Sequence, residues 1–157
     1  MKRISIGAGM KRYPECTHVD KLPLQGIDVV MDIDKLEDWK QFKDNEYDEL
    51  IAEDVIEHSF KVVEVMDECW RILKIGGKMR IRTSYWKTAN SFCDPTHYHF
   101  FTEHSFDYWD ASTEIGKKYG WYCKGRFKIL RRQIDGQELV FELEKLPGDT
   151  VGTIGLA

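Results

Sequence analysis

Residues 47–83 contain a strand, a helix and a second strand with almost nothing between them, and this order restricts the fold more than any other feature of the sequence. Residues 47–52 are rich in apolar residues and end at Glu53-Asp54. The helix is predicted over 59–74 from apolar residues at helical spacing: Val62, Val63, Met66, Cys69, Trp70 and Leu73. Ser59 is the expected N-cap, and Gly76-Gly77 is expected to end the helix. Residues 78–83 then alternate as a strand does, and such a unit favours parallel pairing with a right-handed crossover.

Further strands are predicted on both sides of this unit. Before it they span 3–6, 18–20 and 27–32, with a polar turn or short helix over 35–43. After it, strands 127–134 and 137–146 flank Asp135-Gly136, which is a hairpin-turn signal. We therefore expect a three-layer, Rossmann-like α/β fold with a mostly parallel sheet and a C-terminal antiparallel hairpin. A length of 157 residues suits a single domain, placed at 1–146, with a C-terminal tail at 147–157.

Glycines and acids follow the predicted strands and should line one rim of the sheet. The strand ends are Gly7-Ala8-Gly9, Asp20, Asp32, Glu53-Asp54 and Thr83-Ser84. Ligands of open α/β sheets bind beyond the carboxyl ends of the strands, and glycine lets a ligand approach the backbone closely. An acid after the second strand can accept both hydroxyls of a ribose. An acid after the third strand is placed to meet an adenine amine.

A pyrophosphate site is poorly supported by the same region. A dinucleotide fingerprint requires a third glycine and a helix after the first strand, but Arg12 stands at that position and Pro14 follows. A nicotinamide-binding oxidoreductase half is therefore disfavoured. A ligand with adenosine and an amino acid but no phosphate remains compatible.

These residues resemble those of class I S-adenosylmethionine-dependent methyltransferases, in a small group with a shortened first connection. The matching segments are 6–9, 18–20, 30–33, 47–58 and 68–82, and the most specific part is Asp54-Val-Ile-Glu-His58 followed by a helix and Leu73-Lys-Ile-Gly-Gly77. The resemblance covers residues 3–84 well, and the hairpin by topology only. It departs from the family at Ser5, where an acid is usual, and at Lys11, where a glycine is common. The helix between the first two strands and an N-terminal lid helix also have no counterpart here.

The resemblance implies S-adenosyl-L-methionine as cofactor and gives roles to individual residues. Gly7, Ala8 and Gly9 would pass close to the methionine part, and Asp20 would bind the ribose. Asp32 and Ile33 would flank the adenine. Glu53 would lie beside the sulfonium, with His58 at the start of the following helix.

The acceptor side is expected in the aromatic, histidine-rich segment 84–110, read as a long loop. His97, His99 and Asp94 are the candidate catalytic residues, with His97 or His99 as a general base. Hydrogen-bonded structural histidines and aromatic core packing are the alternatives. His97 and His99 with Asp94 could also hold a metal, although no motif spacing supports this and no metal is expected.

Composition indicates where the protein is located and which partners it binds. The net charge of −4 weighs against nucleic acid. The absence of a long apolar run and of a secretory signal indicates a cytoplasmic protein with reduced cysteines. The expected function is methyl transfer to a small-molecule or sugar-like acceptor, and the alternative is a degenerate cofactor-binding domain that serves as a partner subunit. Val151, Ile154 and Leu156 are predicted to dock on the same chain or on a second copy in a homodimer.

Overall fold

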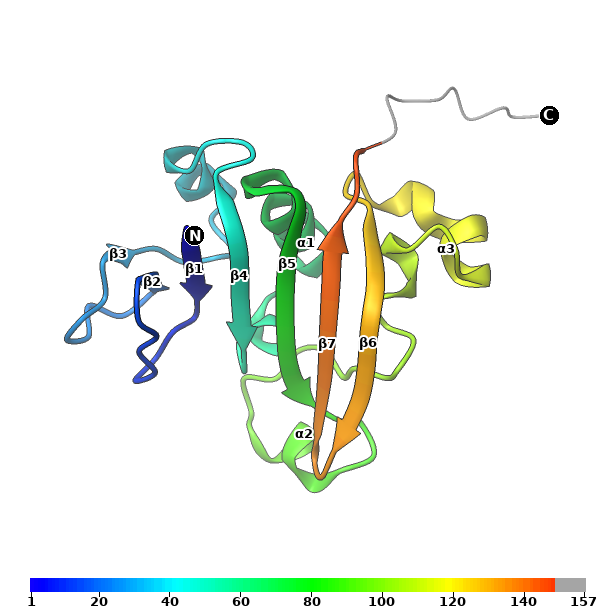
Figure 1. The fold of residues 1–157 in the computed structure, drawn as a ribbon. Coiled ribbons are helices and arrows are strands. Elements are labelled where there is room, and N and C mark those ends of the chain that lie inside the picture. Colours follow the sequence, from blue (N-terminus) through cyan, green and yellow to red (C-terminus); the bar gives the residue numbers. More distant parts are fainter. Residues whose placement is uncertain (149–157) are drawn as a thin grey trace.

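A computed structural model describes residues 1–148, which form one twisted seven-stranded sheet with its helices gathered behind it (Figure 1). The strands are β1 Arg3–Ile6, β2 Cys16–Asp20, β3 Val29–Val30, β4 Tyr47–Glu53, β5 Leu73–Ser84, β6 Phe127–Asp135 and β7 Glu138–Lys145. The α-helices are α1 Val62–Ile72, α2 Ala89–Cys93 and α3 Glu114–Tyr119. Short 3₁₀ helices are η1 Leu36–Gln41, η2 Ile56–His58, η3 Asp107–Trp109 and η4 Gly120–Tyr122. The predicted docking residues Val151, Ile154 and Leu156 lie outside the described part.

The strand order is β3-β2-β1-β4-β5-β7-β6. The first five strands of that order are parallel, and β7 runs antiparallel to both β5 and β6. The predicted Rossmann-like class, with a mostly parallel sheet and a C-terminal antiparallel hairpin, is confirmed. Because β4 reverses the winding direction beside β1, the carboxyl ends of β1 and β4 form a switch point at which ligands bind in such sheets.

Several predicted boundaries are wrong by a few residues. The helix spans 62–72 and not 59–74, and Ser59 does not cap it: its hydroxyl donates to Asp34 Oδ1 at 2.5 Å. Gly76-Gly77 does not end the helix either, because β5 already begins at Leu73. The register between β4 and β5 shifts between the pairs Tyr47–Leu73 and Glu49–Lys78. The two glycines therefore belong to an irregular first part of β5. The strand predicted over 27–32 is reduced to two residues.

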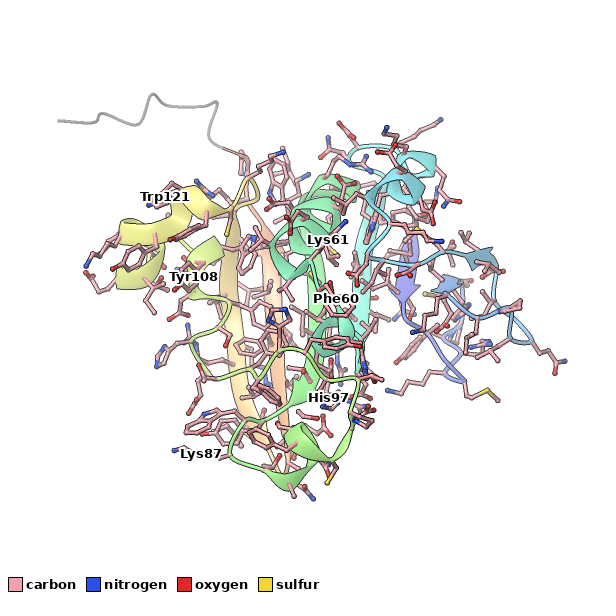
Figure 2. The ribbon with its side chains drawn as sticks, turned by 180° about the vertical axis from the view of Figure 1, so that it is seen from behind. Phe60, Lys61, Lys87, His97, Tyr108 and Trp121 are labelled. Carbon is pink, nitrogen blue, oxygen red and sulfur yellow. The ribbon has the colours of Figure 1, made fainter. Side chains whose placement is uncertain are left out.

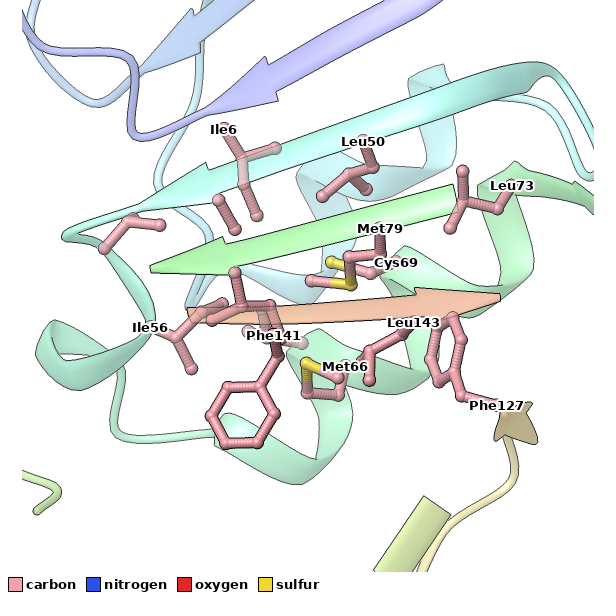
Figure 3. Packing of buried hydrophobic residues seen from close by; sticks show 14 of the residues in the cluster. Ile6, Leu50, Ile56, Met66, Cys69, Leu73, Met79, Phe127, Phe141 and Leu143 are labelled. Atoms are coloured by element: carbon pink, nitrogen blue, oxygen red, sulfur yellow. The ribbon is translucent and has the colours of Figure 1, made fainter. Parts of the chain in front are cut away.

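The core lies between the sheet and α1 (Figure 3). Alternate residues of neighbouring strands form rows that face the helix, such as Leu50, Met79 and Leu143. From α1, the side chains of Val65, Met66, Cys69 and Ile72 meet them and are fully buried. Burying apolar area of this kind provides the main driving force for folding, roughly 25 cal/mol per Å².

The opposite face of the sheet carries no α-helix within residues 1–148 (Figures 1 and 2). We call it the helix-free face; its third layer is reduced to the loop 7–15. Ion pairs cross its strands, joining Arg3 to Glu49, Arg80 to Glu53, Arg82 to Asp54 and Arg131 to Glu142. A charged surface of this kind is stable in water without a covering helix. None of the helices in the described residues is long and apolar enough to cross a membrane.

The segment 85–126, predicted as a loop, contains α2, η3, α3 and η4. Thr113 caps α3 by accepting a hydrogen bond from Gly116 N at 2.9 Å. Helices this short have too few residues for a clear apolar periodicity, so the pattern did not reveal them. Some aromatic residues of the segment are core, such as Phe106 and Trp109, whereas others such as Phe92 and Tyr98 are exposed.

Candidate functional site

A cleft of about 420 Å³ opens at the carboxyl ends of the parallel strands, and its size is typical of a small-molecule site. We call it the strand-end cleft. It is lined by Gly7, Gly9, Asp20, Lys21, Met31, Asp32, Ile33, Asp34, Asp54, Val55, His58, Phe60, Thr96 and Tyr98. Of the residues proposed from the sequence as cofactor contacts, the cleft brings together Gly7, Gly9, Asp20, Asp32, Ile33 and His58. Ala8 is buried behind the turn, and its N–H donates to Val19 O at 2.9 Å.

The turn after β1 requires glycine. Gly7 and Gly9 both have positive φ, +59° and +53°. A Cβ on Gly7 would stand 2.2 Å from Val55 Cγ2, so this position needs glycine both for its backbone angle and for space. No atom would lie within 4 Å of a Cβ on Gly9, so that position is open toward the cleft.

Asp20 is held in place by the backbone around it. Gly9 N donates to Asp20 Oδ2 at 2.8 Å, and Leu22 N donates to Asp20 Oδ1 at 3.0 Å. Each carboxylate oxygen accepts through more than one lone pair and so keeps capacity for a ligand hydroxyl. The carboxylate therefore joins the glycine turn to the end of β2 and is oriented before any ligand arrives.

Asp32 and Asp34 follow β3 and shape the next part of the wall. Asp32 Oδ1 accepts from Asp34 N at 3.0 Å, which tightens the turn. Asp34 in turn accepts from the Ser59 hydroxyl and, at 3.1 Å, from Phe60 N. This contact fixes the segment before α1 against the end of β3.

Asp54 lines the cleft, whereas Glu53 does not. Asp54 has a positive φ of +56° and pairs with Arg82 and Lys11. Burial alone would raise the pKa of Asp54, but the hydrogen bonds from Arg82 and Lys11 outweigh it and hold that pKa below its ordinary value. The carboxylate thus stays ionised at the cleft wall.

Glu53 points to the helix-free face, contrary to the position beside the cofactor expected for it. It accepts from the Tyr13 hydroxyl at 2.9 Å and pairs with Lys11 and Arg80. Burial and then the bond to Glu53 raise the pKa of Tyr13 to about 12. Glu53 therefore anchors the loop 7–15 to the sheet.

The far wall of the cleft comes from η2 and from the segment after α2. Phe60 and Tyr98 stack with ring centroids 3.9 Å apart at its mouth, and both are exposed. His58 donates from Nδ1 to Thr96, and burial and then the nearby His97 lower its pKa. Tyr98 is one of the aromatic residues of the segment 84–110, where the acceptor side was expected. Phe60 lies outside this segment and was missed as a cleft residue, as was Thr96.

None of the three predicted catalytic residues lines the cleft, and only His97 and Asp94 lie near each other. The His99 ring stacks on Phe101, and the Asp94 carboxylate accepts from Thr96. His97 packs against His58 with ring centroids 4.7 Å apart, next to the cleft wall, and its side chain is 9% exposed. Asp94 Oδ2 lies 3.9 Å from His97 Nε2.

Comparison with known proteins finds one family that is similar to part of this chain. The sequence model of a family described as "Methyltransferase domain" matches residues 10–81, which begin directly after the glycine turn and end within β5. The matched part is slightly less than half of the chain, and it agrees with the resemblance to class I S-adenosylmethionine-dependent methyltransferases.

Solved methyltransferase structures share the fold at low sequence identity. A putative methyltransferase in complex with the Haloferax volcanii Trm112 methyltransferase activator has a TM-score of 0.66 at 13% identity, over 93% of this chain and 82% of that one. An S-adenosylmethionine-dependent methyltransferase from Archaeoglobus fulgidus has a TM-score of 0.64 at 16% identity, over 92% and 86%. Burkholderia thailandensis 1,6-didemethyltoxoflavin-N1-methyltransferase, with its substrate and S-adenosylhomocysteine bound, has a TM-score of 0.61 at 14% identity, over 93% and 71%. No protein with a curated description matches the sequence.

Proposed function

We propose that this protein is a class I methyltransferase that binds S-adenosylmethionine in the strand-end cleft and transfers its methyl group to a small-molecule or sugar-like acceptor. The observation that carries the proposal is the composition of the cleft wall: four aspartates and the glycine turn meet there, with Lys21 as the one lysine in the lining. S-adenosylmethionine carries a sulfonium cation, ribose hydroxyls and an adenine amine, all of which suit carboxylates. A phosphate ligand would be repelled by the same wall.

The cofactor would lie along the strand ends in the order that these residues follow. Gly7 and Gly9 would accommodate the methionine part, since neither places a side chain in the cleft. Asp20 would accept the two ribose hydroxyls. Asp32 and Ile33 would flank the adenine, with the buried edge of Met31 behind it. His58 would border the sulfonium end.

Methyl transfer from a sulfonium is an in-line displacement, so the protein contributes mainly by alignment. The acceptor would enter beside the stacked pair Phe60 and Tyr98, which offers an exposed aromatic wall at the cleft mouth. His97 and His99 remain candidate bases, and His97 lies nearer because it contacts His58. A positioned base contributes about 10²–10⁴-fold to such a reaction.

The test is calorimetric titration with S-adenosylmethionine and with S-adenosylhomocysteine, followed by measurement of S-adenosylhomocysteine release with a panel of hydroxyl, amine and sugar acceptors. Binding of both cofactor forms with release that depends on the acceptor is expected. If neither cofactor form binds, the proposal is wrong.

A second candidate is a cofactor-binding subunit that works only with a partner. Two observations favour it: the helix-free face leaves the loop 7–15 as the sole cover on that side within residues 1–148, and one structural neighbour is bound to a methyltransferase activator. Cofactor binding without turnover on any acceptor would favour this candidate over the first.

A further inference from the structure

Three potential metal-ligating side chains converge beside the strand-end cleft. Glu57 and His58 come from η2. His97, labelled in Figure 2, comes from the segment after α2. Each offers one ligand atom, and these atoms all lie within 4.8 Å of one another. Ligands on a tetrahedral metal with bonds of about 2.1 Å stand about 3.4 Å apart, so small side-chain rotations would close the set.

Hydrogen bonds orient both imidazoles for such a role. The Nδ1 of His58 lies 3.1 Å from Thr96 O and 2.9 Å from Thr96 Oγ1. The Nδ1 of His97 lies 3.0 Å from Ser91 O. A backbone carbonyl only accepts, so each Nδ1 carries the proton and each Nε2 keeps its lone pair. Metal-binding histidines are held in the same way by their second nitrogen.

Glu57 is buried without a partner for one of its oxygens. The residue is 2% exposed, and its Oε2 has no hydrogen-bond partner within residues 1–148. A buried carboxyl oxygen left without a partner costs about 1–3 kcal/mol or more, so such atoms call for an explanation. A cation held between this oxygen and the two imidazoles would satisfy it.

The backbone fixes the cluster from both sides. Tyr98 N donates to Glu57 O at 2.8 Å, and His99 N lies 3.3 Å from the same oxygen. The segment that carries His97 is therefore attached directly to η2, which carries the other two side chains. Ligands on a preformed scaffold lose little freedom when a metal binds.

We propose that Glu57, His58 and His97 bind one divalent transition-metal ion, with Zn²⁺ as the best match. Two imidazoles and one carboxylate suit Zn²⁺, whereas Mg²⁺ prefers oxygen ligands alone. Three protein ligands leave a position open, and His58 also lines the cleft, so the open position adjoins it.

A metal at this position would restrict the methyl acceptors that the protein can use. This inference rests on the proposed function. With the metal bound, His97 would serve as a ligand and not as the general base considered above. An acceptor hydroxyl bound at the open position would become more acidic and lose its proton to water. Its oxygen would then attack the methyl carbon while the carbon–sulfur bond breaks, and the electron pair would stay on sulfur as S-adenosylhomocysteine forms. The expected acceptors therefore carry a hydroxyl that can bind a metal.

The test measures metal binding without any turnover. The chelator-treated protein is titrated with Zn²⁺, and in parallel with Mg²⁺, by calorimetry. We expect one Zn²⁺ per chain and no comparable Mg²⁺ site. Glu57→Gln, His58→Asn and His97→Asn should each weaken Zn²⁺ binding at least about tenfold. His104→Asn and Cys93→Ser are the matched controls, because His104 pairs with Asp107 away from the cluster and Cys93 is an exposed thiol.

Three results would overturn the inference: no Zn²⁺ binding by the intact chain, unchanged binding in all three variants, or an equal loss in the two controls. Circular dichroism of each variant shows whether it has folded, and His97→Gln provides a second variant at that position. Titration with S-adenosylmethionine is run separately. Zn²⁺ binding without cofactor binding would refute the proposed function and leave the metal site standing, and the reverse result would do the opposite.

Discussion

Asp20 is the residue whose substitution tests the proposed cofactor site most directly. We expect Asp20→Ala to weaken S-adenosylmethionine binding by about 1.5–3 kcal/mol, the range for one charged hydrogen-bond partner. Calorimetric titration measures this, with Asp135→Ala in the exposed hairpin turn as a matched loss of one carboxylate. Asp20→Asn keeps an acceptor for Gly9 N and separates the loss of charge from the loss of the turn contact. Unchanged affinity in Asp20→Ala would refute the ribose assignment.

The two glycines of the first turn provide a comparison at nearly identical backbone angles. Gly7→Ala should destabilise the fold and weaken cofactor binding, because its Cβ would overlap Val55 while φ is positive. Gly9→Ala carries only the backbone strain, of order 1 kcal/mol, since its Cβ meets open space. Thermal unfolding of both variants should therefore rank Gly7→Ala well below Gly9→Ala. Equal losses would mean that the contact with Val55 is relieved by movement of the turn.

Strand ends could be found from the sequence, but the side to which each residue points could not. Asp20 and Asp32 were expected at the ligand rim, and both line the cleft. Glu53 was expected there on the same argument and instead faces the helix-free face. Its strand, β4, has buried apolar residues on both faces, for example Ile51 and Ala52. Because β4 has no clearly polar face, the alternation of its side chains does not predict which face Glu53 points to.

At the scale of elements, Lys145 ties the end of β7 to the junction of α1 and β5. Its side chain is buried, and Nζ donates to Leu73 O at 2.7 Å and to Asn45 Oδ1 at 2.8 Å. Burial lowers the pKa of Lys145 to about 8, against the opposing pull of Asp44. The direction follows from burial, which penalises the charged form of a lysine.

A stability measurement across pH tests this burial. The folded pKa of about 8 lies below the unfolded value of about 10.4, so the unfolded state binds more protons between these values. The penalty is complete below pH 8 and fades as the pH rises toward 10. The free energy of unfolding, measured by urea between pH 7.5 and 9.5, should rise relative to that of Lys145→Met. A parallel pH dependence in the two proteins would contradict the lowered pKa.

Long elements with a regular apolar periodicity could be predicted from the sequence, whereas short or irregular elements could not. The periodicity of Val62 to Leu73 located α1, but its N-terminal boundary was wrong because Ser59 bonds Asp34, a residue distant in sequence. Likewise, the passage from α1 into β5 at Leu73 is set by pairing with Tyr47 and not by the glycines that follow. Boundaries fixed by tertiary contacts leave no local signal.

For the whole molecule, a mostly parallel sheet and the missing helix between the first two strands could be predicted from the sequence, but the order of the strands in the sheet was not predicted. Right-handed crossovers place the β1–β2 connection on the face opposite α1, as observed. That connection is only the loop 7–15. Lys11 of the loop pairs with Glu53 of β4, which also pairs with Arg80 of β5, and these charged side chains are stable in contact with water on this face. The Asp54–His58 stretch, noted in the sequence for its resemblance, proved to hold both cleft and metal-site candidates, because η2 turns directly after β4.

The rise in Tm on cofactor binding tests the residue, the cleft and the whole fold in one measurement. A cofactor that binds only the folded state stabilises it by about 2.7 kcal/mol at a concentration of 100 times Kd. For a chain of this length, 1 kcal/mol corresponds to about 2–4 °C, so S-adenosylhomocysteine at that concentration should raise the Tm by about 5–10 °C. At the same concentration Asp20→Ala should show at most about half of this shift, because its Kd is expected to rise more than tenfold. A full shift in Asp20→Ala would place the cofactor away from the end of β2, and no shift in the intact chain would remove it from the strand-end cleft.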